Sequence, residues 1–158
     1  MRLLEKAHEN CVAGRRVRIL ADHLAELIPQ NASVLDVGCG DGLLSKLIRE
    51  RRPDLRIRGI DVMVRPNAAV PIDAFDGTHI PAADGTQDVV MFVDVLHHTI
   101  DPRVLLREAR RVARRAVLIK DHTRTGPMAE ATLRFIDFVG NARFGVSLPY
   151  NFWCRKQW

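Results

Sequence analysis

The stretch from residue 33 to residue 42 reads SVLDVGCGDG, and it constrains the fold of this chain more than any other segment. It begins with a short apolar run that contains one acidic residue, Asp36, and continues with glycine at positions 38, 40 and 42. Apolar side chains at helical spacing follow directly. The pattern predicts a buried strand, a tight turn and a helix start, with the backbone of the turn close to a ligand.

Spacing separates two interpretations of this glycine-rich turn. A dinucleotide-binding fold places its third glycine one residue later, where this chain has Leu43. The G-x-G-x-G spacing behind an acidic strand residue instead resembles motif I of the class I S-adenosylmethionine-dependent methyltransferases. An ordinary glycine-rich connection is the plain alternative, but the acid, the spacing and both flanking patterns agree with the motif.

The chemistry of S-adenosylmethionine suits these residues. The resemblance implies that Asp36 accepts from the ammonium group of the cofactor, or from water bound to it. Free N–H groups at the helix start near Asp41 would meet its carboxylate. The product would be S-adenosylhomocysteine. The residues that the resemblance implies for cofactor binding are Asp36, Gly38, Cys39, Gly40, Gly42, Asp61, Val62, Asp76, Gly77, Asp94 and Val95.

Strand and helix patterns alternate along the chain. Apolar spacing predicts helices over residues 2–12 (ending near Gly14), 17–28, 43–48, 102–113 and 128–139. Apolar runs predict strands over residues 34–37, 55–61, 70–74, 88–93 and 116–119, with a short helix between the second and third. The alternation predicts an α/β fold with a mainly parallel sheet and helices on both faces. The resemblance implies a Rossmann-like, doubly wound sheet in the order 3-2-1-4-5, which binds ligands at the carboxyl ends of its strands.

Acidic residues follow the second and third predicted strands. Asp61 ends the second strand, where a carboxylate can accept both ribose hydroxyls. The resemblance implies that Asp76, which Gly77 follows, receives the adenine amino group. The alternative for Asp61 is a solvated carboxylate at a strand end, and the alternative for Asp76 is an ordinary Asp-Gly turn.

Residues 92–98 read FVDVLHH and begin at the end of the fourth predicted strand. This segment resembles the corresponding one of the type 11 methyltransferases. Asp94 lies where a carboxylate could face the ammonium group or the methylene groups beside the sulfonium. His97 and His98 are the candidate catalytic residues at the mouth of the site, because either could take a proton from the acceptor as the methyl group arrives. The alternative is a structural role, as a cap or in a hydrogen bond to a loop carbonyl.

A second polar group, Lys-Asp-His, ends the fifth predicted strand at residues 120–122. His122 could contact the acceptor, or it could be an ordinary loop residue. Methyl transfer depends mainly on alignment and desolvation, so the chain needs no nucleophile of its own. We expect no metal, because adjacent histidines lack the i, i+4 spacing of a helical metal site.

Composition limits the class of protein and its partners. The chain has 158 residues, 47% of them apolar, and a net charge of +5. No leader peptide or membrane span is visible, and the three cysteines lack metal spacing, so we expect reduced thiols, a cytoplasmic location and no membrane contact. The positive charge could attract RNA or DNA, but the arginines are scattered without interleaved aromatic residues. A small-molecule acceptor is therefore the leading expectation.

The resemblance extends well over residues 30–122. We expect a single domain in residues 1–158, with an N-terminal helical segment in residues 1–29, the cofactor-binding core in residues 30–122, and a C-terminal helix and tail in residues 123–158. The sheet of the family normally continues with two more strands, one of them antiparallel, and these C-terminal strands are missing from the pattern here.

An uncovered fifth strand would leave an exposed sheet edge, which proteins usually avoid. We expect partial disorder near the C-terminus, or a homodimer in which a second copy covers this edge. The tail residues that would cover it are Phe144, Tyr150, Phe152, Trp153 and Trp158. The alternatives are a fragment, a cofactor-binding but catalytically incomplete domain that needs a partner chain, an RNA or DNA methyltransferase, and a nicotinamide dehydrogenase, which Leu43 disfavours.

Overall fold

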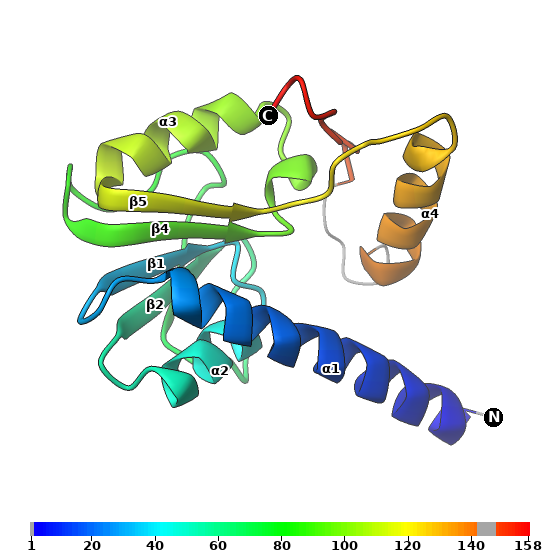
Figure 1. Cartoon of the computed structure of the whole chain (residues 1–158), viewed down its shortest axis with the longest axis horizontal. Coiled ribbons are helices and arrows are strands. Elements are labelled where there is room, and N and C mark those ends of the chain that lie inside the picture. Colours follow the sequence, from blue (N-terminus) through cyan, green and yellow to red (C-terminus); the bar gives the residue numbers. More distant parts are fainter. Residues whose placement is uncertain (1, 142–147) are drawn as a thin grey trace.

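The computed structural model describes the backbone of residues 2–141 and 148–158, and the side chains of residues 14–139 and 148–158. Helices and strands alternate along the chain (Figure 1). The elements are α1 (Arg2–Leu27), β1 (Ser33–Val37), α2 (Leu43–Arg51), β2 (Arg56–Asp61), β3 (Ile72–Ala74), β4 (Gln87–Val93), the 3₁₀ turn η1 (Leu96–His98), α3 (Pro102–Val112), β5 (Ala113–Lys120) and α4 (Ala129–Asn141).

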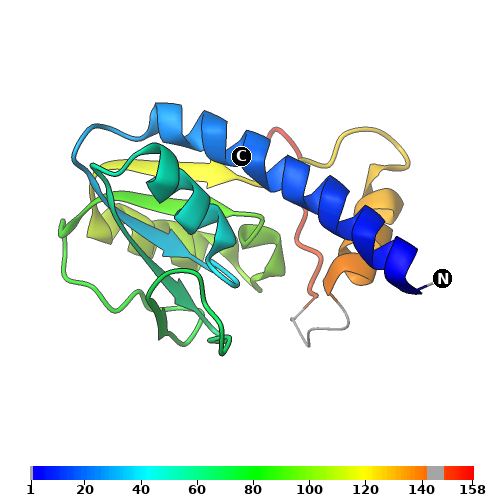
Figure 2. The same ribbon diagram turned by 90° about the horizontal axis from the view of Figure 1, so that it is seen from below.

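The strands form one five-stranded parallel sheet in the order β3-β2-β1-β4-β5. This confirms the predicted α/β fold, a Rossmann-like doubly wound sheet. Helices α1 and α2 cover one face and α3 covers the other (Figures 1 and 2). The chain reverses its direction of winding between β1 and β4, so the carboxyl ends of these strands flank the point where ligands of such sheets bind.

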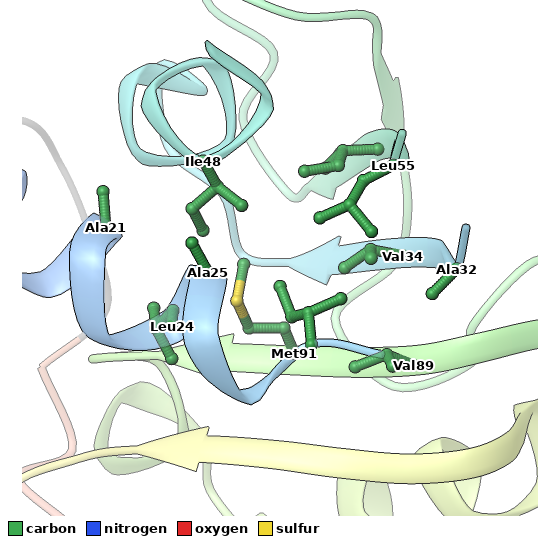
Figure 3. Packing of buried hydrophobic residues seen from close by; sticks show 11 residues of the cluster. Ala21, Leu24, Ala25, Ala32, Val34, Ile48, Leu55, Val89 and Met91 are labelled. Atoms are coloured by element: carbon green, nitrogen blue, oxygen red, sulfur yellow. The ribbon is translucent and has the colours of Figure 1, made fainter. Parts of the chain in front are cut away.

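One hydrophobic cluster lies between the sheet and helices α1 and α2 (Figure 3). Ala21 and Ala25 are one helical turn apart and almost fully buried, and their small side chains let α1 lie close to α2. Ile48 fills the space beneath α2. The buried residues of this cluster are Ala21, Leu24, Ala25, Ile28, Ala32, Val34, Ile48, Leu55, Ile57, Val89 and Met91.

A second cluster lies between the other face of the sheet and α3. Its buried residues are Leu35, Val37, Ile60, Ile80, Val90, Phe92, Leu96, Leu105, Ala109 and Val112. Since successive side chains of a strand point to opposite faces, β1 and β4 are buried on both sides, as the continuous apolar runs predicted. Packing on both faces fixes the carboxyl ends of these strands.

The helices differ from the sequence prediction in several places. The expected break near Gly14 is wrong, because α1 continues without interruption from Arg2 to Leu27; glycine in a helix costs only about 0.5–1 kcal/mol relative to alanine. The short helix expected between β2 and β3 is also wrong: residues 62–71 form turns and bends, and Pro66 and Pro71 have no N–H for helical hydrogen bonds. Helix α4 does not end at Val139, and its last residue is Asn141.

Two strands differ from their predicted bounds by more than one residue. Strand β3 begins at Ile72, after Pro71, whose missing N–H keeps it out of the ladder. Strand β5 begins at Ala113, three residues before the predicted start at 116. The first residues of β5 include arginines, so an apolar pattern does not reveal them. Arg114 pairs with Asp88 of the neighbouring strand β4 at 2.5 Å.

The C-terminal tail returns to η1. The N–H of Asn151 donates to the carbonyl of His97 at 3.1 Å, and Asn151 Nδ2 donates to the carbonyls of Thr99 and Ile100 at 2.6 and 2.8 Å. Phe152 is buried. In the described part of the chain, β5 pairs only with β4, and an isolated bridge between Arg124 and Cys154 follows it.

The expected homodimer stays a prediction. Phe144, which the sequence analysis placed at its interface, lies outside the described residues. Among the helices that the structure describes, a segment both long and apolar enough to cross a membrane is not found.

Candidate functional site

A cavity of about 370 Å³ opens at the carboxyl ends of β1 and β4, beneath α1. Its volume is in the range of sites for small organic ligands. The residues that line it are Arg16, Val17, Leu20, Asp36, Gly38, Cys39, Gly40, Asp41, Leu43, Leu44, Val93 and Asp94. The cavity thus gathers the acid of β1, the glycine turn and the end of β4, as the sequence predicted. It adds one face of α1, which the sequence did not single out.

The glycine turn is tight on one side and open on the other. Gly38 has φ +73°, and a Cβ there would lie 2.6 Å from the side chain of Val95, so only glycine fits. Gly40 has φ +63°, and a Cβ there would meet no protein atom within 4 Å. The backbone at Gly40 therefore faces open space in the cavity wall, where a ligand can approach closely.

Two further residues of the turn pack against its surroundings. Gly42 precedes α2 with φ +74°, and a Cβ there would lie 2.7 Å from Val70. Cys39 packs on Gly59, where a Cβ would come within 2.3 Å of its sulfur. Burial, together with the nearby charges of Asp36 and Asp61, raises the pKa of the Cys39 thiol, so this thiol stays protonated at neutral pH.

Asp36 is a buried carboxyl group in the wall of the cavity, with 2% of its surface exposed. Ser45 Oγ of α2 donates a hydrogen bond to its Oδ2 at 2.6 Å. Burial raises the pKa of Asp36 to about 6, the hydrogen bond from Ser45 opposes this rise, and the charge of Asp61 adds to it. A cationic ligand group in the cavity would compensate this buried charge.

Asp61, at the end of β2, accepts a hydrogen bond from the glycine turn. The N–H of Gly40 donates to its Oδ2 at 2.8 Å, and the N–H of Met63 donates to its Oδ1 at 2.9 Å. Val62, the next residue, is exposed. A Cβ at Gly77 would lie 3.2 Å from the side chain of Val62, so these two predicted cofactor residues are neighbours.

Asp76 organises a turn after β3. Its Oδ1 accepts from the N–H groups of His79 and Thr78, both at 2.7 Å, and from Thr78 Oγ1 at 2.8 Å. These hydrogen bonds lower the pKa of Asp76. The local geometry is that of the Asp-Gly turn named as the alternative in the sequence analysis, and a contact of Asp76 with adenine stays a prediction.

Asp94, the residue after β4, has a left-handed conformation, with φ +56°. Arg16 of α1 donates to its Oδ2 at 2.8 Å, Lys120 of β5 donates to its Oδ1, and His122 Nε2 lies 3.4 Å from the same oxygen. Burial lowers the pKa of His122, and the charge of Asp94 opposes this effect. Sequence reasoning missed Arg16, because only the fold brings residues 78 positions apart into contact.

His97 lies on η1 and is buried, with 3% of its surface exposed. Its Nδ1 lies 2.5 Å from Asp121 Oδ1, and the N–H of Leu96 donates to the other oxygen of Asp121 at 2.8 Å. Burial tends to lower the pKa of His97, but the hydrogen bond and charge of Asp121 outweigh it, and the pKa is raised. The ring of Phe152 stacks on His97 at a centroid distance of 5.0 Å, so the ring is covered, and the predicted place of His97 at the mouth where an acceptor enters stays a prediction.

Asp137 of α4 reaches both candidate catalytic histidines. Its Oδ1 lies 3.6 Å from His97 Nε2 and 3.5 Å from His98 Nε2. In Figure 1, α4 lies beyond the carboxyl ends of β4 and β5. The sequence analysis missed Asp137, since it reads as one acidic residue of an amphipathic helix.

Comparisons with known proteins agree with this geometry. A family model described as "Methyltransferase domain" matches residues 12–145. The ubiquinone biosynthesis O-methyltransferase of Sodalis glossinidius is 29% identical over 94 residues, which cover 52% of this chain and 37% of that protein. The ribosomal RNA-processing protein 8 of Caenorhabditis elegans is 29% identical over 108 residues, which cover 68% of this chain and 27% of that protein. This chain therefore spans well under half the length of these relatives.

Solved structures share the fold. In the complex of the Trm112 methyltransferase activator of Haloferax volcanii with a methyltransferase, a chain matches with a TM-score of 0.69 and 16% identity, over 96% of this chain and 68% of that one. The YcgJ protein of Bacillus subtilis matches with a TM-score of 0.67 and 19% identity, over 91% of this chain and 64% of that one.

Proposed function

Because this chain belongs to the class I S-adenosylmethionine-dependent methyltransferases, we propose that it transfers the methyl group of S-adenosylmethionine to a small-molecule acceptor. We propose further that residues 1–158 act as one domain in the cytoplasm. The observation that carries the cofactor assignment is the cavity in which the buried Asp36 adjoins the open side of Gly40.

The residues of this cavity fit the amino-acid end of the cofactor. Asp36 would accept from the ammonium group, directly or through water, and this cation would offset the cost of a buried carboxylate. The N-terminus of α2 would offer N–H groups to the cofactor carboxylate. Gly40 would leave room for the ligand against the backbone. When bound, the cofactor supplies a methyl group already activated by a sulfonium centre.

Asp61 would receive the ribose. A carboxylate has about four acceptor positions, and the N–H groups of Gly40 and Met63 occupy two of them. The remaining positions suffice for the two ribose hydroxyls. The neighbouring surface of Val62 and Gly77 would then contact the adenine ring.

His97 would act as the general base for the acceptor. Asp121 binds Nδ1 and so leaves the lone pair on Nε2, which takes the proton of the acceptor as the methyl group arrives. Asp121 then stabilises the imidazolium that forms. His98, whose ring centroid lies 4.1 Å from that of His97, would border the same acceptor position.

The burial of His97 supports a small acceptor rather than a nucleic acid. Its ring lies beneath Phe152 and beside Asp137 of α4, so the acceptor has to enter a narrow space. A base that RNA or DNA presents would require flipping out of its stack, and a strip of basic and aromatic residues to hold the strand. The net charge of +5 keeps an RNA or DNA acceptor as a case to test.

A second candidate is a cofactor-binding domain that becomes active only with a partner chain. The observation that favours it is the exposed apolar surface of α4, where four large side chains are at least half exposed. These are Phe135, Ile136, Phe138 and Val139. The Haloferax volcanii neighbour was solved in complex with a methyltransferase activator, and a protein of that kind could cover such a surface.

Calorimetry with S-adenosylmethionine, S-adenosylhomocysteine and NAD tests the cofactor assignment. We expect binding of the first two and none of NAD; the reverse would overturn the proposal. Transfer of a labelled methyl group to small-molecule extracts or to RNA then separates the acceptors. Cofactor binding without transfer to either, restored by an added partner chain, would favour the second candidate.

A further inference from the structure

Three side chains near the candidate acceptor position lie as metal ligands do. His97 and His98 of η1 and Asp137 of α4 each offer one ligand atom, and these atoms lie within 4.8 Å of one another. The side chains are 3%, 16% and 6% exposed, respectively. We propose that these three residues bind a zinc ion, and that zinc regulates the enzyme by occupying its base.

The spacing of the ligand atoms suits a tetrahedral ion. Bonds of about 2.0–2.1 Å from zinc to nitrogen and oxygen separate two tetrahedral ligand atoms by about 3.3 Å, and octahedral geometry would bring them to about 2.9 Å. The carboxylate oxygen of Asp137 lies 3.6 and 3.5 Å from the two imidazole nitrogens. The two imidazole nitrogens lie within 4.8 Å of each other, so a bound ion would draw the two rings together.

The donor set favours zinc over magnesium or calcium. Imidazole nitrogen is a preferred ligand of zinc, whereas magnesium and calcium select oxygen. His97 and His98 supply two nitrogens and Asp137 supplies one oxygen. Three protein ligands leave the fourth tetrahedral position open for water or for a second ligand.

Asp121 orients the His97 ring for metal binding. Metal-binding histidines usually donate their other ring N–H to a carboxylate, which fixes the tautomer and the ring orientation. Nδ1 of His97 lies 2.5 Å from Asp121 Oδ1, so in the neutral ring that donates from Nδ1 the lone pair of Nε2 lies on the side of Asp137. Three backbone N–H groups hold Asp121 in turn, those of Leu96 at 2.8 Å, His97 at 3.3 Å and His122 at 2.6 Å.

The charges of the cluster suit a divalent cation. The carboxylates of Asp121 and Asp137 lie in a buried space. A zinc ion would offset two negative charges there. The same contacts would also suit a purely hydrogen-bonded network, and zinc titration separates the two.

The proposal that zinc regulates the enzyme rests on the function proposed above. A zinc ion on His97 Nε2 occupies the lone pair that the proposed transfer step uses. Zinc should therefore inhibit methyl transfer without displacing S-adenosylmethionine, because Asp36 and Gly40, which line the cofactor cavity, are not among the three zinc ligands.

Zinc titration of the metal-free 158-residue chain, followed by calorimetry, tests the site independently of activity. We expect one ion per chain. His98→Gln and Asp137→Asn should each weaken zinc affinity at least about tenfold, and Asp121→Asn should weaken it about 10–100-fold through the orientation of His97. The control is His79→Gln, which removes a solvent-exposed histidine that pairs with Glu108 away from the cluster. Its zinc affinity should equal that of the wild type.

Cobalt substitution identifies the donor atoms. Visible bands of a tetrahedral ion without a thiolate charge-transfer band would support the His-His-Asp site, whereas such a band would assign the metal to a cysteine and overturn it. Unchanged zinc affinity in both His98→Gln and Asp137→Asn, with folding checked by circular dichroism, would also overturn the site. Zinc binding without inhibition would leave the site standing and overturn the assignment of His97 as the base.

Discussion

Replacement of Asp36 by asparagine tests the central electrostatic feature of the site. The side chains have nearly the same shape, and Ser45 Oγ, which donates to Asp36 Oδ2 at 2.6 Å, can donate equally to an amide oxygen. The substitution therefore removes a buried negative charge and leaves the packing nearly intact. In the protein without cofactor, we expect Asp36→Asn to become more stabilising as the pH rises.

The magnitude follows from the pKa of this carboxyl group. A rise from 3.8 to about 6 means that the folded protein holds the proton more tightly than the unfolded chain, which corresponds to about 3 kcal/mol. The wild type therefore loses stability as the pH rises from about 4 to about 6, and the loss persists above that range. Between pH 4 and pH 8, Asp36→Asn should gain about 2–3 kcal/mol relative to the wild type.

Urea unfolding at both pH values, followed by circular dichroism, measures this gain. Asp73→Asn is the matched control, because it removes a carboxylate that is exposed on β3. Other carboxyl groups titrate in both proteins, so their contributions cancel in the difference. A gain below about 0.5 kcal/mol would refute the argument that Asp36 is an ionisable group held in a desolvated wall.

The same substitution should have the opposite effect on cofactor binding. The cofactor ammonium favours the ionised carboxylate, so binding below about pH 6 should release a proton from Asp36. Loss of this charged partner should weaken the binding of S-adenosylmethionine by about 1.5–3 kcal/mol. Calorimetry in two buffers of different ionisation enthalpy detects the proton, and unchanged affinity in Asp36→Asn would assign the ammonium to another group.

Three further substitutions test the other assignments. Asp61→Ala should weaken cofactor binding by about 1.5–3 kcal/mol in calorimetry, the scale for hydrogen bonds to charged groups. Unchanged affinity would contradict the assignment of Asp61 to the ribose. His97→Ala should lower the rate of methyl transfer about 10²–10⁴-fold with cofactor affinity nearly intact, and an unaltered rate would return His97 to a structural role. Phe92→Ala should lower the free energy of unfolding by about 3–5 kcal/mol in urea, since Phe92 is fully buried beneath α3; a loss below about 1 kcal/mol would contradict a closely packed second cluster.

The sequence predicted much of the fold because local patterns carried it. The apolar run of β4 and the proline that follows Asp101 mark their elements without tertiary information, and Asp101 indeed accepts from the N–H of Arg103 at the start of α3. The prediction was wrong where local signals misled. Gly14 marks no break in α1, and the arginines at the start of β5 concealed its first residues.

The sequence likewise predicted one part of the candidate site and not the other. Asp36, Gly38 and Gly40 follow one another along the chain, so their spacing alone indicates a ligand-binding turn. Contacts between residues that are far apart in the sequence produce no such spacing pattern. Arg16 on Asp94 and Asp137 on the two histidines depend on how helices α1 and α4 pack around the ends of the strands.

The sequence by itself determined the parallel sheet and the place of the cofactor turn, because hydrophobic periodicity and glycine spacing act within a few residues. Only the tertiary structure decided the electrostatics of the site. The burial of Asp36, the pairing of His97 with Asp121 and the approach of Asp137 each join segments that sequence order keeps apart. Desolvation and charge pairing depend on distances in space, and the chain sets those distances only when it folds.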